Sequence, residues 1–229
     1  MVGPEEIETN LARLREEIDR ALEKAGRKSE SLVLVAVTKT HPAEYIDAAI
    51  RYGITDIGEN RIQEFESKRP RVMGQARWHL IGHLQKNKIN KALALFDLIQ
   101  SVDSFGLAEE ISKRAGKDVE VLVQVNSSGE ESKYGFAPDQ AKEETLRIAE
   151  LEHIKVKGLM TIGPFVDDEI MVRKSFVPVK KMFDDLKQFE TENVKMDYLS
   201  MGMSNDFAWA IAEGANMIRV GSLIFGARG

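Results

Sequence analysis

The chain contains no cysteine among its 229 residues. Disulfide bonds and thiolate nucleophiles are therefore excluded, and so are zinc and iron–sulfur sites that depend on cysteine ligands. His79 and His83 are four residues apart, but they fall on a predicted strand and turn, where this spacing does not bring two ligands together. No third ligand is evident in the sequence, so we expect no metal site.

Long hydrophobic runs are also lacking. No apolar stretch approaches the roughly 20 residues that a membrane-spanning helix needs, and the N-terminus MVGPEEIETN is acidic where a secretion signal would be basic and then apolar. We therefore expect a cytoplasmic protein without membrane contact. The net charge of -5 argues against nonspecific nucleic-acid binding as its main task.

What the chain does contain is a regular alternation of short apolar runs and helical patterns. An amphipathic pattern over residues 4–25 predicts a first helix that ends at Gly26. Eight strand candidates follow, with helical patterns between them, at residues 32–37, 54–57, 78–81, 97–101, 119–125, 154–160, 196–200 and 217–220. Such alternation indicates parallel pairing, and eight units close a (β/α)₈ TIM barrel. We predict this α/β fold, as a single domain spanning residues 1–229.

Two details of the predicted barrel are unusual. Few residues follow the eighth strand, so we expect no full final helix; the extra N-terminal helix would cover the gap, and Ser222 to Phe225 could add a turn. Pro178 would cost about 3 kcal/mol inside a helix. We therefore start the seventh helix near Ser175, which places Pro178 in the first turn and leaves VDDEIMVRK as a separate turn or loop.

The candidate site residues follow from a rule of this fold, which places functional residues at the carboxyl ends of the strands. The buried-looking run in VAVTKTHP, residues 35–42, ends on Lys39. The same rule selects Asn60, His79, Met160 and Arg219 after or at the end of later strands. A lone lysine in this position can also be an ordinary solvated charge.

Two turns at the predicted mouth contain glycine and serine. SMGMSND, residues 200–206, joins a strand to a helix and offers Ser204 or Asn205 as an N-cap, and RVGS, residues 219–222, offers a second turn. Their amides and hydroxyls favour an anion. They match the phosphate site that TIM barrels build after strands seven and eight, although both could be ordinary turns.

A lysine that faces a phosphate site is typical of proteins that hold pyridoxal 5′-phosphate (PLP), because the amine condenses with the aldehyde while the phosphate is bound elsewhere. Arg219 could direct its guanidinium at the pyridine nitrogen. Since arginine stays protonated, that nitrogen would accept a hydrogen bond rather than carry a proton, which makes the ring a poorer electron sink. The alternative for Arg219 is a structural salt bridge to Glu59 or another carboxylate at the mouth.

Taken together, these motifs closely resemble those of the pyridoxal phosphate homeostasis proteins, relatives of the alanine racemase N-terminal barrel. The resemblance rests on AVTKT (36–40), IGENRIQE (57–64), WHLIGHLQKNK (78–88), VNSSGEESKYG (125–135), KGLMTIG (157–163) and residues 199–228. It implies that Lys39 forms a Schiff base with PLP and that Arg219 meets the pyridine nitrogen. It also implies a phosphate site of Ser200, Ser204, Gly221 and Ser222, with Asn60, His79 and Met160 near the cofactor.

The resemblance leaves the question of whether the cofactor does chemistry. In alanine racemase a tyrosine from a separate C-terminal β domain supplies the second acid–base group, and we expect no such domain here. We therefore expect a monomeric PLP carrier that serves homeostasis by buffering or delivery, with apo PLP enzymes as candidate recipients. The alternative is a weak PLP-dependent amino-acid racemase, with Lys39 as one base and water, His79 or Tyr134 as the other. A third possibility, an interaction module, rests on the basic stretch KNKINK, residues 86–91.

Overall fold

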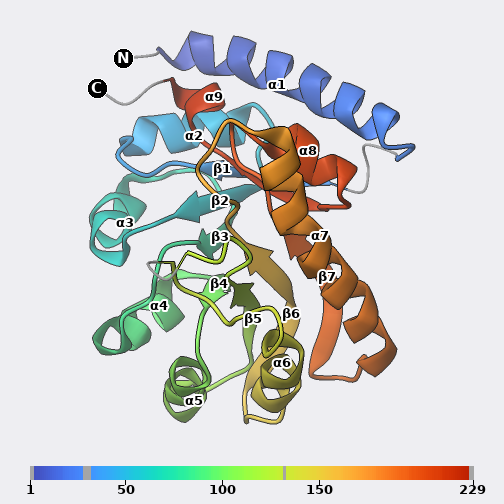
Figure 1. Ribbon diagram of the computed structural model, residues 1–229. Helices are drawn as coiled ribbons and strands as arrows, with labels where there is room; N and C mark the ends of the chain where they lie inside the picture. The colour runs from blue at the N-terminus through green and yellow to red at the C-terminus, as the bar shows by residue number, and fades with distance from the viewer. Residues whose placement is uncertain (1–2, 28–31, 131–132, 227–229) are drawn as a thin grey trace.

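The computed structural model describes residues 3–27, 32–130 and 133–226. Within them, eight strands form a closed barrel of parallel strands in sequence order (Figure 1). The strands are β1 (Val33–Val37), β2 (Asp56–Glu59), β3 (Arg77–Leu80), β4 (Leu98–Val102), β5 (Val119–Val125), β6 (Ile154–Thr161), β7 (Val194–Ser200) and β8 (Met217–Val220). β1 closes the barrel because Val35 lies opposite Asp56 on one side and Arg219 on the other. The predicted TIM barrel is confirmed.

Helices surround the barrel; α2 to α8 connect successive strands, α1 precedes β1 and α9 follows β8 (Figure 1). In the described residues they are α1 (Pro4–Lys24), α2 (Ala43–Arg51), α3 (Ile62–Lys68), α4 (Ile89–Leu95), α5 (Phe105–Arg114), α6 (Ala141–Ala149), α7 (Glu169–Leu186), α8 (Phe207–Ala212) and α9 (Ser222–Phe225). Short 3₁₀ turns η2 (Arg69–Arg71), η3 (Lys86–Lys88) and η4 (Lys187–Phe189) adjoin α3, α4 and α7.

The N-terminal helix lies where the barrel has only a short helix after its last strand. α1 crosses α2, α8 and α9 and buries an apolar stripe that includes Ile7, Leu11 and Leu14 (Figure 1). Asn10 Nδ2 donates a hydrogen bond to the carbonyl oxygen of Ile224 at 3.1 Å. α1 thus covers the part of the barrel beside the four-residue α9, as predicted.

The predicted start of the seventh helix was wrong. α7 begins at Glu169, because the Asp168 carboxylate accepts a hydrogen bond from the Met171 N–H at 3.0 Å and caps the helix, and Pro178 lies inside it. The helix has a continuous buried stripe that includes Val172, Phe176 and Val179. Burial of this stripe on both sides of Pro178 outweighs the loss of one backbone hydrogen bond.

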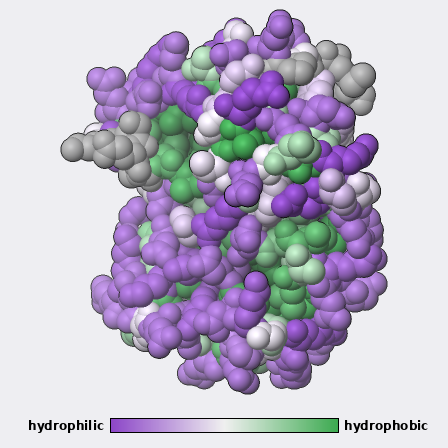
Figure 2. Space-filling view, turned by 180° about the vertical axis from the view of Figure 1, so that it is seen from behind, coloured by the Kyte–Doolittle hydropathy of each residue, from purple (hydrophilic) through white to green (hydrophobic). Residues whose placement is uncertain are grey.

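The core has two parts. The larger part lies between the barrel and its helices, and a smaller cluster fills the inside of the barrel with Val35, Leu98, Leu122, Met160 and Met217. Seen from behind, the surface is mostly hydrophilic, with apolar areas between the polar side chains (Figure 2). Because the inside of the barrel holds an apolar cluster, the polar groups that are buried there need hydrogen-bond partners.

Candidate functional site

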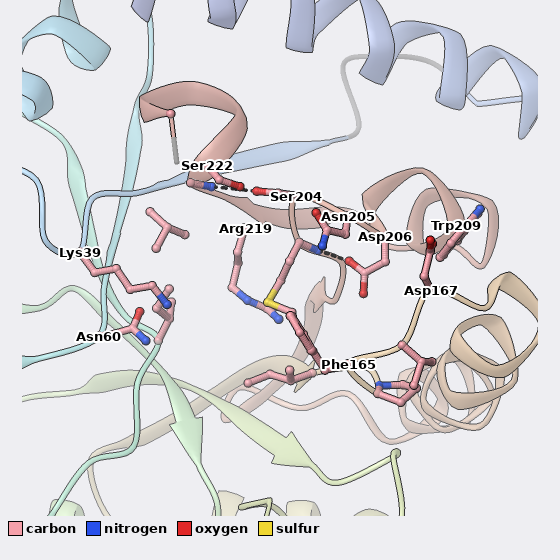
Figure 3. A pocket seen from close by; sticks show the side chains of 18 of the residues that line it. Lys39, Asn60, Phe165, Asp167, Ser204, Asn205, Asp206, Trp209, Arg219 and Ser222 are labelled. Carbon is pink, nitrogen blue, oxygen red and sulfur yellow. Dashed lines mark hydrogen bonds between the residues drawn. The ribbon is translucent and has the colours of Figure 1, made fainter. Parts of the chain in front are cut away.

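A cavity of about 690 Å³ lies at the carboxyl ends of the strands. Six of the nine predicted site residues line it: Lys39, Asn60, Ser204, Arg219, Gly221 and Ser222. Figure 3 shows Lys39 and Asn60 on one side, Ser204 and Ser222 on another, and Arg219 between them. The cavity volume lies within the range of roughly 300–1,000 Å³ that is usual for small-molecule sites.

Lys39 is carried into the cavity by a tight turn that follows β1. We call residues Thr38–His41 the Lys39 turn. The His41 N–H donates to the Thr38 carbonyl oxygen at 3.1 Å, and Thr40 has a φ of 68°. The Thr38 N–H donates to the carbonyl oxygen of Gly58 at 3.1 Å, which fixes the entry of the turn to the neighbouring strand.

The two glycine-containing turns after β7 and β8 contact each other. The Gly221 N–H donates to Ser204 Oγ at 3.4 Å, so the serine hydroxyl belongs to both turns. The predicted N-cap was wrong: α8 begins at Phe207 after Asp206, whose carboxylate accepts a hydrogen bond from the Met203 N–H at 2.5 Å. Ser204 is left at the cavity wall, where its hydroxyl can meet a ligand.

Arg219 is held from behind by two hydrogen bonds. Its Nη1 donates to Ser200 Oγ at 2.6 Å and its Nη2 donates to the Thr161 carbonyl oxygen at 2.8 Å. Burial lowers the pKa of Arg219 to about 10, which still leaves it charged at neutral pH. The alternative of a salt bridge to Glu59 is not what the structure shows, because Glu59 pairs with Lys68 at 2.7 Å.

A chain of hydrogen bonds runs from Arg219 across the inside of the barrel. Ser200 Oγ donates to Gln100 Oε1 at 2.7 Å, Gln100 Nε2 meets His79 Nδ1 at 2.8 Å, and His79 Nε2 meets Asp56 Oδ1 at 2.8 Å. We call these five residues the interior polar chain. They come from β2, β3, β4, β7 and β8, so the chain joins strands on different sides of the barrel.

The partners of His79 fix its protonation state. The Gln100 oxygen accepts from Ser200, which leaves the NH₂ group of the amide facing His79 Nδ1. The same Nε2 lies 3.2 Å from the Met217 sulfur, a second acceptor that suits an NH₂ group. Nδ1 must then accept, and Nε2–H donates to Asp56. Burial lowers the pKa of His79, in agreement with this neutral form. Burial alone would raise the pKa of Asp56, but hydrogen bonds from His79 and Thr55 lower it overall.

Three predicted site residues lie beneath the cavity rather than in its wall. His79, Met160 and Ser200 are fully buried and are not among the lining residues. Ser200 reaches the cavity through its hydrogen bond to Arg219, whereas Met160 packs in the apolar cluster inside the barrel. Alternation along a strand indicates an inward-facing side chain but not its depth below the mouth.

Other residues of the wall were not predicted. Pro164, Phe165, Val166 and Asp167 of the loop after β6 line the cavity, and so do His41, Asp206 and Trp209. Burial raises the pKa of Asp206. Asn60 Oδ1 is buried and has no hydrogen-bond partner among the described residues. The wall therefore combines a buried cation, serine hydroxyls, an available amide oxygen and aromatic rings.

Comparison with known proteins extends this description. Residues 9–229 match the sequence family described as alanine racemase, N-terminal domain. The pyridoxal phosphate homeostasis protein of Aquifex aeolicus is 41% identical over 222 residues, which cover 95% of this chain and 96% of that protein. A crystal structure of an unknown protein from Bifidobacterium adolescentis has a TM-score of 0.92 and 41% identity, and covers 97% of this chain and 95% of the other. PipY of Synechococcus elongatus PCC7942, solved with PLP bound, has a TM-score of 0.82 and 34% identity over 96% of this chain and all of its own.

Proposed function

Because the chain belongs to the family of pyridoxal phosphate homeostasis proteins, we propose that it binds PLP through a Schiff base on Lys39 and serves PLP homeostasis. The observation that carries the proposal is the meeting of Lys39, Arg219 and the two serine-containing turns in one cavity. The structure of PipY with PLP bound supports it by similarity.

The residues of the cavity fit this cofactor. Ser204 and Ser222 present hydroxyls for a phosphate, and Gly221 keeps the turn close to β1, because a Cβ there would lie 3.0 Å from the Val37 carbonyl oxygen. The buried, unpartnered Oδ1 of Asn60 lies in the same wall as Lys39. A buried polar atom of this kind is usually satisfied by a ligand or by water.

Each residue has a distinct task in this proposal. PLP, when bound, supplies an aldehyde that condenses with amines and a conjugated ring that withdraws electrons. Lys39 would supply the amine that holds it, and Arg219, which can only donate hydrogen bonds, would direct N–H groups at the ring nitrogen. Ser200 has no place at the cavity wall, so we assign it to holding Arg219 rather than the phosphate.

The placement of the candidate second bases favours a carrier over a racemase. His79 is buried beneath the cavity, and Tyr134 is 55% exposed and stacks on His83 with ring centroids 3.8 Å apart. Neither lines the cavity. A weak racemase activity would have to use water or an unpredicted residue of the wall, such as His41 or Asp206, as the second acid–base group.

The visible absorption spectrum tests the cofactor. We expect added PLP to give a yellow protein, and borohydride reduction to fix the label on the peptide that contains Lys39. Lys39→Ala should abolish the band, whereas Lys91→Ala, which removes a surface lysine paired with Glu66, should keep it. Label scattered over surface lysines, or a normal band in Lys39→Ala, would overturn the proposal.

The proposal also covers properties of the protein beyond cofactor binding. We propose that it delivers PLP to apo PLP enzymes, that it is a cytoplasmic monomer, and that residues 1–229 form a single domain. No helix in the described residues is long and apolar enough to cross a membrane. Light scattering of the purified protein measures its molar mass and so tests the monomeric state. Delivery is tested by adding an apo PLP enzyme to the PLP-loaded protein and measuring whether that enzyme regains activity.

A further inference from the structure

A buried ammonium lies directly behind the turn that carries Lys39. Lys68, the last residue of α3, is only 3% exposed. Its Nζ donates to the carbonyl oxygen of Thr38 at 2.7 Å and to that of His41 at 3.1 Å. These are the first and last residues of the Lys39 turn, so one cation holds both ends.

Two glutamates complete the contacts of this cation. Glu64 Oε1 accepts a hydrogen bond from Lys68 Nζ at 2.9 Å and from the Thr40 N–H at 2.5 Å. Glu59 Oε1 lies 2.7 Å from Lys68 Nζ and accepts from Thr38 Oγ1 at 2.6 Å. We call Glu59, Glu64 and Lys68 the Lys68 cluster. It binds three backbone atoms of the four-residue turn, two carbonyl oxygens and one N–H.

The backbone of the turn needs this support. Thr40 has a φ of 68°, in the left-handed region that a β-branched residue rarely adopts. Such a conformation persists where surrounding contacts determine it. The hydrogen bond from the Thr40 N–H to Glu64 and the two bonds from Lys68 are contacts of this kind.

We propose that Lys68 is a positioning residue for Lys39: it holds the Lys39 turn in the shape that directs the Lys39 amine into the cavity. Lys68 itself does not line the cavity, so it acts through the turn and not on a ligand. A compact ammonium with three donors suits this task better than a planar guanidinium, because its partners surround it. The inference rests on the proposed function in one respect, since it takes Lys39 as the residue that binds PLP.

The first test needs no cofactor. Hydrogen exchange, followed by mass spectrometry on the peptide that contains residues 38–41, reports on the amides of the Lys39 turn, the Thr40 N–H among them. Glu64→Ala removes the carboxylate that accepts the hydrogen bond from the Thr40 N–H, and the Glu64 side chain is 26% exposed. We expect this substitution to speed exchange of the peptide. Glu64→Gln keeps an oxygen acceptor and should restore slow exchange. Lys68→Met should speed exchange as well.

The second test measures how fast Lys39 captures PLP. Borohydride trapping at set times gives the rate, and we expect Lys68→Met and Glu64→Ala to slow it by roughly one to two orders of magnitude. Lys157→Met is the control, because Lys157 on β6 pairs through Nζ with Asp197 on β7 at 2.6 Å and neither residue lines the cavity. It should leave both the rate and the exchange of the turn unchanged.

Each outcome decides the inference. Faster exchange with slower capture, at a temperature where circular dichroism shows folded protein, supports it. Unchanged exchange in both Glu64→Ala and Lys68→Met overturns it, as does capture at the wild-type rate. If Lys68→Met does not fold because Glu59 is left without its cation, Glu64→Ala alone decides. If wild type does not capture PLP at all, the proposed function fails, and the exchange data still report whether the turn is held as described.

Discussion

Mild acid is expected to destabilise the protein through His79. This residue is fully buried, donates to Asp56 and accepts from Gln100, and burial lowers its pKa. The unfolded chain therefore takes up a proton at His79 at a higher pH than the folded chain does. Stability is then lost as the pH falls through the unfolded pKa of about 6.5 and on toward the folded pKa.

The size of the effect follows from this linkage. With an unfolded pKa of about 6.5 and an imidazole that stays neutral in the folded chain, the free energy of unfolding falls by at most about 1.4 kcal/mol between pH 7.5 and pH 5.5. A protonated imidazole would point a second N–H at the Gln100 amide, which itself donates, so the fold offers the proton no acceptor there. Glu59 and Asp206, whose pKa values are raised by burial, act in the opposite direction and favour folding as the pH falls.

Urea unfolding at the two pH values, for wild type and for His79→Gln, isolates the histidine. Glutamine keeps a donor for Asp56 but does not titrate, and all other groups are common to both proteins. We expect wild type to lose more than His79→Gln over the range, by up to about 1.4 kcal/mol. Equal losses in the two proteins would refute the assignment of a buried neutral imidazole.

Three further predictions concern packing, capping and the cavity. Phe65→Ala removes a fully buried ring and should lower the free energy of unfolding by about 3–5 kcal/mol in urea, whereas Phe189→Ala, at 44% exposure, should lower it by less than about 1 kcal/mol. Ser104→Ala removes the hydroxyl that caps α5 and should cost about 1 kcal/mol in the same assay, a result that an unchanged midpoint would contradict. Arg219→Lys should weaken PLP binding about tenfold or more in a spectroscopic titration, since charged hydrogen bonds contribute about 1.5–3 kcal/mol, and unaltered affinity would remove Arg219 from the proposed site.

Most of the barrel could be predicted because its strands are short apolar runs separated by amphipathic helices. The fifth and eighth strands have the predicted bounds, and the other strands differ by one or a few residues at their ends. The error at α7 arose because Pro178 was weighted as a helix boundary. The stripe of Val172, Phe176 and Val179 continues through it, and burial of that stripe decides the outcome.

The site could be predicted only in part, because a sequence pattern does not give depth. Lys39 and Arg219 follow from the strand-end rule, but nothing local shows that His79 and Met160 lie below the cavity. Lys68 was missed although its spacing carried a signal: it follows Ile62 and Phe65 in steps of three, which places it on the buried face of α3. A lysine on a buried face requires partners, and these are contributed by segments that come earlier in the chain.

The interior polar chain also limits how this sequence can change over time. Each of its five side chains satisfies the next, from Asp56 to Arg219, and they stand on five different strands. A single replacement leaves a buried polar group of another strand unpaired, at a cost of about 1–3 kcal/mol. Replacements at these positions are therefore epistatic, and homologous barrels that abandon this arrangement should differ at several of the five positions together.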